Sequence, residues 1–394
     1  MNILKKWFDR IMDFTNRHLW LVIFLLLIPS FYTGKAEYFG PFYGYVFYLL
    51  VWPVAVFIVI DFVFIRKKKP SALMIVFLIL HFWMTIEQLR IESYTYINYC
   101  NIVRAVSIVA LIEMFYEDKP LDLIKALMLM FEILIYIDTV TIVINLINGD
   151  PKGETFLAWY NNIIVFTLPA ICVAITYMKL TGRYIRAGVL CVVSVISTFI
   201  STAATPIMAM AAFVGLFLFQ LFLYKVIGVK KFRLWPWIIL ALCLNVFLVV
   251  IYRPGVFTFI DEFVINVLHR SPNFTGRTLI WDDAIKTIMK APIFGYGNVP
   301  ESPLGVDLAP HPHNEILNTW MRYGIIGVLI YAVFSYLYMR EIEKMDDNIY
   351  KIVFISLVFG VYIAFITDWI SRSYIYYILF FIAYHFKQIK ANKD

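Results

Sequence analysis

Residues 311–331 read HPHNEILNTWMRYGIIGVLIY, a polar stretch with two histidines that continues as an apolar helical pattern. On a helix that begins near Asn314, the side chains of Glu315, Asn318 and Arg322 fall within about 60° of one another at roughly 100° per residue. Arg322 would lie about 10 Å further along the axis than Glu315, at roughly 1.5 Å per residue. A charge at that depth in an apolar helix is costly unless it faces a partner or a water-filled cavity. We therefore interpret this polar stripe as a functional site.

The start of this helix also has the features of an anion-binding site. Its first N–H groups lack intrahelical acceptors and carry the positive end of the helix dipole. The cationic and titratable side chains near it in the sequence are His311, His313, Arg322, Arg253, Arg270 and Arg277. We predict that the ligand is a phosphate and that His313 acts as a general base toward a neighbouring hydroxyl, because imidazole changes charge near neutral pH. The structural alternative has equal weight: Asn314 caps the helix and the histidines hydrogen-bond to loop carbonyls.

The composition indicates what kind of fold positions these residues. The chain has 394 residues, of which 62% are hydrophobic and 15% charged, and its mean hydropathy is +0.78. These values exclude a water-soluble globular domain and predict an all-α, polytopic membrane helix bundle. Apolar runs close to the roughly 20 residues that cross a bilayer predict about twelve transmembrane helices, at 19–32, 41–65, 71–89, 97–115, 121–147, 161–179, 187–203, 205–225, 234–252, 314–338, 351–367 and 373–386.

The positions of lysine and arginine predict the orientation of the bundle, because cytoplasmic loops retain these residues. With the N-terminus inside, most of them fall in inner segments, whereas the short outer loops hold only Lys35, Arg90, Lys152 and Arg372. We expect both termini to be cytoplasmic, and we expect the N-terminal segment to remain uncleaved because no small-residue cleavage site follows its apolar run. This topology explains the net charge of +7, and no clustered basic surface predicts a nucleic-acid partner.

One connection is much longer than the others. Residues 253–313 separate two predicted helices and would lie outside the cytoplasm, directly before the motif-bearing helix at 314–338. They contain two amphipathic segments, GVFTFIDEFVINVLH and TLIWDDAIKTIMKAP, in which apolar residues recur with helical spacing. We expect these helices to lie along the outer membrane surface or to cover a cavity. The sequence shows no repeat or soluble domain, so we treat 1–394 as a single integral membrane domain.

Other polar residues have simpler interpretations. Arg104, together with Asp138 or Glu132 of the next predicted helix, indicates a structural ion pair at least as readily as a ligand site. The four cysteines are isolated in apolar sequence, which predicts core residues rather than disulfides or zinc ligands. The HExxH, GxSxG, P-loop and GxGxxG patterns are missing from the sequence, so we predict neither a metal nor a cofactor.

The motif-bearing helix resembles a known family signature. His313 and Asn314 are followed by nine residues and then by Gly324-Ile-Ile-Gly327, which is similar to the H-[NSQ]-x9-G-x-x-G pattern of the O-antigen ligase and O-antigen polymerase superfamily. The stretches TGRTLIW and APIFGYG within 275–297 resemble a loop pattern of the same family. Gly324 and Gly327 lie away from the polar stripe, so we expect them to let a neighbouring helix approach closely.

The resemblance implies a GT-C-like, metal-independent, inverting glycosyltransferase of the bacterial cytoplasmic membrane. It implies an oligosaccharide on undecaprenyl pyrophosphate as the donor, used at the outer face to build O-antigen, capsule or exopolysaccharide. Chain-length regulator and flippase proteins would then be further partners. Carried over by motif, the catalytic residues would be His313 as the base and Glu315, and the pyrophosphate ligands would be Arg277, Arg322, His311, Asn314, Asn318, Arg253 and Arg104.

The chain departs from the family on a middle helix, where ISTAATPIMAM carries Ala203 and Ala204 at the place of a cation. Either Arg104 or Arg253 replaces that cation, or the diphosphate is held by fewer contacts. The rather short, aromatic-rich chain favours a repeat-unit polymerase over a ligase. A transporter of polysaccharide or lipid is the alternative from another class, although inverted repeats and broken mid-membrane helices would then be expected. A GT-C enzyme with an acidic residue in its first outer loop has the support of Glu37 alone.

Overall fold

A computed structural model describes residues 17–31, 41–90, 96–157, 161, 163–266, 271–273, 276–297, 311–367 and 373–388. The first helices are α2 (Leu19–Leu27), α3 (Pro41–Ile60), α4 (Ala72–Arg90), α5 (Tyr96–Phe115), α6 (Pro120–Ile147), α7 (Ile163–Thr181), α8 (Tyr184–Ile200) and α9 (Ala204–Phe222). The later helices are α10 (Trp235–Val246), α11 (Thr258–Asn266), α12 (Arg277–Lys290), α13 (Glu315–Glu343), α14 (Asn348–Thr367) and α15 (Tyr376–His385). Short helical turns are η1 (Ile28–Phe31), η3 (Asp61–Ile65), η5 (Leu223–Ile227), η6 (Phe247–Ile251) and η7 (Ser373–Ile375).

The chain is a polytopic helical membrane protein. Among the described residues, seven helices are long and apolar enough to cross a membrane, and four shorter apolar helices accompany them. The predicted segments coincide with these helices to within a few residues; for example, 121–147 corresponds to α6, and 97–115 to α5. The expected number of twelve crossings is not confirmed, because helices such as α15 are too short to count by length alone.

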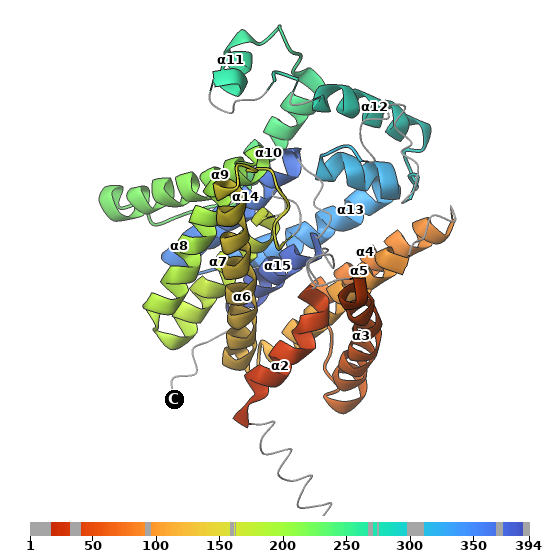
Figure 1. Ribbon diagram of the computed structural model, residues 1–394, viewed down its shortest axis with the longest axis vertical. Helices are drawn as coiled ribbons and strands as arrows, with labels where there is room; N and C mark the ends of the chain where they lie inside the picture. The colour runs from red at the N-terminus through yellow and green to blue at the C-terminus, as the bar shows by residue number, and fades with distance from the viewer. Residues whose placement is uncertain are drawn as a thin grey trace, which may run out of the picture.

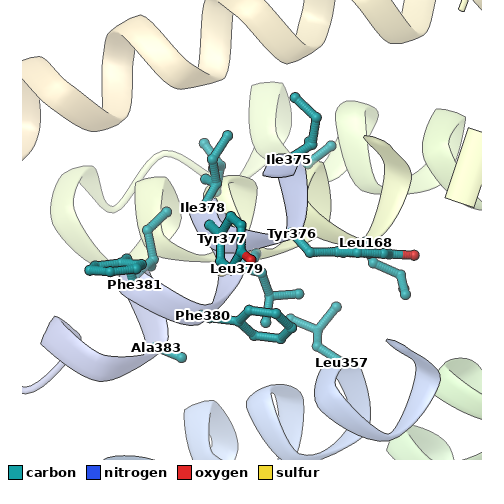
Figure 2. Close-up of a cluster of buried hydrophobic side chains, with 14 of the residues drawn as sticks. Leu168, Leu357, Ile375, Tyr376, Tyr377, Ile378, Leu379, Phe380, Phe381 and Ala383 are labelled. Atoms are coloured by element: carbon teal, nitrogen blue, oxygen red, sulfur yellow. The ribbon is translucent and has the colours of Figure 1, made fainter. Parts of the chain in front are cut away.

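The helix α15 forms the centre of the bundle. Residues 376–383 are buried on every side of it, as expected of a helix enclosed by other helices. Figure 2 shows these side chains directed to different sides of the helix, with Phe380 extending toward Leu357 of α14. The ring of Phe380 also stacks on Tyr338 of α13, with centroids 4.5 Å apart. This core therefore fixes α13, the motif-bearing helix, against the rest of the bundle.

The helices are arranged around α13, α14 and α15. Figure 1 shows α3 to α5 on one side of these three helices and α7 and α8 on the other, while α2 packs against α6. The helices α11 and α12 lie together at one end of the molecule, beyond α10 and α13 (Figure 1). The connection between α10 and α13 thus forms a separate layer over the beginning of the motif-bearing helix.

The amphipathic pattern predicted for α12 is confirmed. Trp281, Ala284 and Ile288 are buried, while Lys286 on the opposite face is exposed. The buried face packs on α13 in a small second core that includes Leu317 and Met321. This second core places α12 directly on the first turns of α13.

The pattern predicted for α11 is only partly matched. Val264 is buried, but Val256 and Phe259 of the same expected face are 69% and 81% exposed. The end of that segment, at 267–268, lies outside the described residues. The exposed apolar residues of α11 therefore do not pack on the protein, and they remain available to a membrane surface as predicted.

Candidate functional site

The first turn of α13 is closed by Asn314. Its side-chain Oδ1 accepts a hydrogen bond from the backbone N–H of Leu317 at 3.0 Å, which is the N-cap of the structural alternative. Its Nδ2 donates to the carbonyl oxygen of Ile366 at 2.9 Å, and the residue is fully buried. Both polar atoms of the Asn314 amide thus have partners within the protein, which does not support Asn314 as a pyrophosphate ligand. The amide instead holds α13 to the end of α14 and shapes the turn that carries the histidines.

The two histidines lie side by side directly before this cap. The ring centroids of His311 and His313 are 4.2 Å apart and the rings are steeply inclined, with an interplanar angle of 62°. His313 has a φ of +47°, in the left-handed region that non-glycine residues seldom adopt. Both residues are half-buried. A strained residue of this kind at the start of a helix agrees with a functional position, because surrounding contacts must hold it there.

The polar stripe predicted for α13 exists in the structure. Arg322 is buried, and its Nε donates to the Oδ1 of Asn318 at 2.8 Å. Glu315 is close enough to act electrostatically on the Arg322 guanidinium. Arg322 is buried, so the stripe forms the deep part of the candidate site. A further anion could bind this guanidinium only by reaching it through a polar opening.

The helix α12 brings a second arginine toward the histidines. The indole Nε1 of the buried Trp281 donates to the carbonyl oxygen of Pro312, between the two histidines, at 2.9 Å. Arg277 precedes Trp281 by four residues and so lies on the same face of α12, one turn closer to the start of the helix. Gly276, whose φ is +87°, supplies the left-handed residue that lets the helix begin at Arg277. The Gly-Arg pair of the sequence pattern therefore lies one turn of α12 before the residue that contacts the histidine turn.

The helix α13 is interrupted two residues after Arg322. Gly324 has φ +64° and ψ −173°, which breaks the helical hydrogen-bond ladder. The freed carbonyls of Met321 and Arg322 accept hydrogen bonds from the backbone N–H groups of Tyr296 and Gly297, at 2.8 and 2.6 Å. These two donors belong to the Pro-x-x-Gly-x-Gly turn at 292–297, here called the glycine turn. The glycine turn therefore closes the break and fixes the backbone of Arg322.

The glycines of the motif have a different role from the one we expected. A Cβ at Gly324 would lie 1.9 Å from the carbonyl oxygen of Ile293, so the close neighbour is the backbone of the glycine turn and not a helix. A Cβ at Gly327 would lie 2.5 Å from the Cβ of Tyr323 in the preceding turn of α13, and 3.7 Å from Trp83 of the neighbouring helix α4. Close approach is needed at Gly324 because two backbone segments meet there.

Two of the proposed pyrophosphate ligands have other partners. The Nη2 of Arg253 donates to the Oδ1 of Asp282 on the surface of α12, at 3.1 Å. Arg104 is buried on α5, where its Nε donates to the carbonyl oxygen of Pro29 at 3.3 Å and its guanidinium lies over the ring of Tyr48. These contacts link Arg104 to η1 and α3, so they give no support to Arg104 as a replacement for the missing cation. Arg270 lies outside the described residues.

The suggested pairing of Arg104 with Glu132 is also corrected. Glu132 of α6 forms its ion pair with Arg186 of α8, whose Nε donates to Oε1 at 2.7 Å. Asp138 accepts a hydrogen bond from the backbone N–H of Leu157 at 2.7 Å. Both carboxylates thus stabilise contacts on the α6 side of the bundle.

Tryptophan residues contribute to the site in a way that sequence reasoning missed. Besides Trp281, the indole N–H of Trp320 donates to the carbonyl oxygen of Pro292 at 3.0 Å, and that of Trp83 donates to Tyr323 at 2.9 Å. All three acceptors are backbone carbonyls beside the histidine turn, the glycine turn or the break in α13. A buried indole N–H needs an acceptor, but the sequence does not indicate which carbonyl supplies it.

The cationic side chains of this region could bind an anion. Among the residues that the structure describes, no three His, Cys, Asp or Glu side chains lie together as a metal site would require. The cationic candidates are Arg277 of α12 and Arg322 of α13. Trp281, one turn after Arg277, contacts the histidine turn, and Arg322 is bonded to Asn318. Such a site can hold an anion and place a base beside it.

Comparisons with known proteins agree with the sequence pattern. Residues 189–332 match the family model described as O-antigen ligase, a range that runs from α8 to the middle of α13. A protein of Rickettsia conorii that carries the provisional name polysaccharide ligase is 26% identical over 110 residues, and a protein of the same name from Rickettsia prowazekii is 28% identical over a stretch of equal length. These matches cover 24% of this chain and 27% of each relative. The matched part is therefore about a quarter of the length of these relatives.

Proposed function

We propose that this chain, whose residues 189–332 match the family model described as O-antigen ligase, transfers glycan from undecaprenyl pyrophosphate to an acceptor hydroxyl at the outer face of the bacterial cytoplasmic membrane. The observation that carries this proposal is the hydrogen bond from Trp281 to the carbonyl of Pro312 at 2.9 Å. It brings the face of α12 that holds Arg277 to the turn that holds His313. This contact supports the assignment of a base and a cation from two elements to the same site.

In the proposed reaction, His313 removes the proton from the acceptor hydroxyl as its oxygen attacks the anomeric carbon of the donor sugar. The bond between that carbon and the pyrophosphate oxygen breaks, and the electron pair leaves with the pyrophosphate. Attack opposite the leaving group inverts the configuration at the anomeric carbon. Arg277 and Arg322 stabilise the negative charge that grows on the pyrophosphate. The carboxylate of Glu315 stabilises the positive charge of the Arg322 guanidinium.

The acceptor distinguishes two functions with the same donor chemistry. The sequence alone favoured a polymerase, whose acceptor is a second lipid-linked repeat unit. The family model and the relatives bear the name of ligases, so transfer to a different acceptor is the second candidate. A polymerase extends its own product, whereas a ligase consumes each donor once.

An assay with purified protein, a synthetic undecaprenyl-pyrophosphate oligosaccharide and EDTA tests the proposal. We expect product with the wild type and a loss of at least about a hundredfold in His313→Ala and Arg277→Ala, since each removes a group acting in the transition state. Lys286→Ala is the matched control, because Lys286 lies on the exposed face of α12 with 74% of its side chain accessible. A ladder of longer lipid-linked glycans indicates a polymerase. Unchanged donor in the wild type, or donor moved across liposomes without reaction, would contradict glycosyl transfer.

A further inference from the structure

The glycine turn is tethered to α4 by Arg90, the last residue of that helix. The Nη2 of Arg90 donates to the carbonyl oxygen of Gly295 at 2.7 Å. Its Nε donates to the Oε2 of Glu87, one turn earlier on α4, at 2.8 Å. The guanidinium also lies over the ring of Phe294, 5.9 Å from the centroid. Arg90 therefore joins the end of α4 to the middle of the glycine turn through both polar and aromatic contacts.

Glu87 gives this tether a fixed base. Its carboxylate is only 1% exposed, and its ion pair with Arg90 is 2.7 Å long. A carboxylate so deeply buried needs a cation, because an unpaired buried charge is very costly. The guanidinium is therefore held in one orientation, and its remaining N–H groups are directed at the glycine turn. About half of the Arg90 side chain is exposed, so the Coulomb attraction itself adds little to overall stability.

The tether reaches Arg322 through close contacts between the backbone of the glycine turn and the backbone of α13. A Cβ at Gly295 would lie 2.6 Å from the carbonyl carbon and oxygen of Arg322, so the two backbones are in direct contact. The N–H of Gly297 donates to the same carbonyl oxygen at 2.6 Å. Because α13 is broken at Gly324, the usual helical bonds do not hold this carbonyl. A displacement of the glycine turn therefore displaces the backbone that carries the Arg322 side chain.

We propose that Arg90, oriented by Glu87, is a positioning residue that sets the place of Arg322 through the glycine turn. This inference rests on the proposed function, in which Arg322 stabilises the departing pyrophosphate. Arg90 lies outside residues 189–332, the part of the chain that the family model matches. Through Arg90 the end of α4, a helix that contributes no residue to the proposed chemistry, controls the geometry of the site.

The test compares Arg90→Gln with Arg66→Gln. Arg66 is a matched control, because its Nε also pairs with a carboxylate on its own helical segment, Asp61, at 2.9 Å, but at the far end of α3. Hydrogen exchange measures the protection of the amides of Tyr296 and Gly297, and transfer kinetics give kcat and KM for the lipid-linked donor. Exchange does not depend on activity, so it reports on the tether even if the wild type transfers no glycan.

We expect Arg90→Gln to raise exchange at Tyr296 and Gly297 at least tenfold. We also expect kcat to fall by about ten- to a hundredfold with KM changed less than about threefold, because misplacing a group that acts on developing charge mainly affects the transition state. Arg90→Lys keeps a cation between Glu87 and Gly295 and should recover most of kcat. If Arg90→Gln does not purify as a monodisperse protein, Arg90→Lys is compared with the wild type instead. We then expect a decrease in kcat that is smaller than the one predicted for Arg90→Gln.

Three results would overturn the proposal. The first is unchanged exchange in Arg90→Gln, which would mean that Arg90 does not hold the glycine turn. The second is raised exchange with an unchanged kcat, which would mean that the turn does not position Arg322. The third is an equal effect of Arg66→Gln, which would indicate a general loss of stability. An inactive wild type would instead refute the proposed function, and the exchange data would still show whether the tether exists.

Discussion

Trp281 of α12 and Pro312 of the histidine turn are joined by a hydrogen bond of 2.9 Å between the indole N–H and the backbone carbonyl, and both residues are buried. This bond connects two segments that are 31 residues apart in the chain. It orders the turn between His311 and His313, and it sets the direction in which α12 presents Arg277. The relationship makes the site sensitive to a single atom of the tryptophan.

Replacement of Trp281 by phenylalanine tests that relationship. The phenyl ring keeps most of the packing, but the buried carbonyl of Pro312 loses its donor, which costs about 1–3 kcal/mol. We expect a decrease in transfer activity of at least tenfold and a modest fall in the melting temperature. Trp237→Phe on α10 is the control and should change activity less than twofold. Equal effects of the two substitutions would show that the indole N–H of Trp281 is unimportant.

Gly324→Ala should be among the most destabilising single substitutions in the chain. Alanine would have to adopt φ +64°, and its Cβ would meet the carbonyl oxygen of Ile293 at 1.9 Å, so either α13 or the glycine turn must move. We expect a loss of several kcal/mol, on the order of overpacking and backbone strain combined. Gly215→Ala in α9, where nothing lies within 4 Å, should be neutral or slightly stabilising. Thermal unfolding in detergent compares them, and equal melting temperatures would contradict the description of the break.

A buried histidine–glutamate contact at the ends of α5 and α15 should stabilise the bundle independently of the site. The Nε2 of His385 lies 2.6 Å from the Oε1 of Glu113, and both side chains are 1% exposed. Ser71, directly before α4, donates from its hydroxyl to the same carboxylate oxygen at 2.7 Å. Three helices are thus joined at one carboxylate, and His385→Ala should lower stability by about 1–3 kcal/mol because the buried carboxylate loses a hydrogen-bond partner.

The control for this pair is Lys344→Ala at the end of α13. Lys344 pairs with Glu341 at 2.7 Å, but half of the lysine side chain is exposed, so its removal should cost about 0–1 kcal/mol. Denaturation in a mixed detergent system measures both free energies of unfolding. A His385→Ala variant as stable as Lys344→Ala would show that the buried pair contributes nothing.

Alkaline pH should loosen the segment that contains α11. The hydroxyl of Tyr252 lies against the carboxylate of Asp261 and 2.8 Å from the carbonyl oxygen of Pro272. Burial and the Asp261 carboxylate raise the pKa of Tyr252 above its ordinary value of 10.0. The neutral phenol therefore stabilises the folded state below about pH 10, and this contribution is lost as the pH rises through the raised pKa.

Limited proteolysis of this segment between pH 8 and pH 11 measures that effect. We expect cleavage of the wild type to increase above pH 10, and we expect the increase to be smaller in Tyr252→Phe, which has no ionisable hydroxyl. Tyr336→Phe, at an exposed position on α13, should behave as the wild type. The interpretation fails if Tyr252→Phe shows the same dependence on pH as the wild type.

Local patterns predicted most of the elements in this protein. Helix bounds follow from apolar runs and their periodicity, which depend only on residues close in the chain, and the limits of α5 and α6 agree with them. The stripe that pairs Asn318 with Arg322 follows from the helical repeat, and so does the buried face of α12. The motif around His313 also indicated the family from residue types and spacing alone.

The tertiary structure decided what each polar residue contacts. The break at Gly324 depends on the glycine turn, which supplies donors from about 25 residues away, and no local propensity predicts such a partner. Arg104 and Arg253 have the same chemistry as Arg322, but they donate hydrogen bonds to Pro29 and Asp282, respectively. The sequence places Arg90 in a short outer loop, whereas the structure shows its hydrogen bond to the carbonyl of Gly295. The sequence determines which charges exist and which helices carry them, whereas their partners depend on packing between distant segments, because the cost of burying a charge is set by whatever lies beside it.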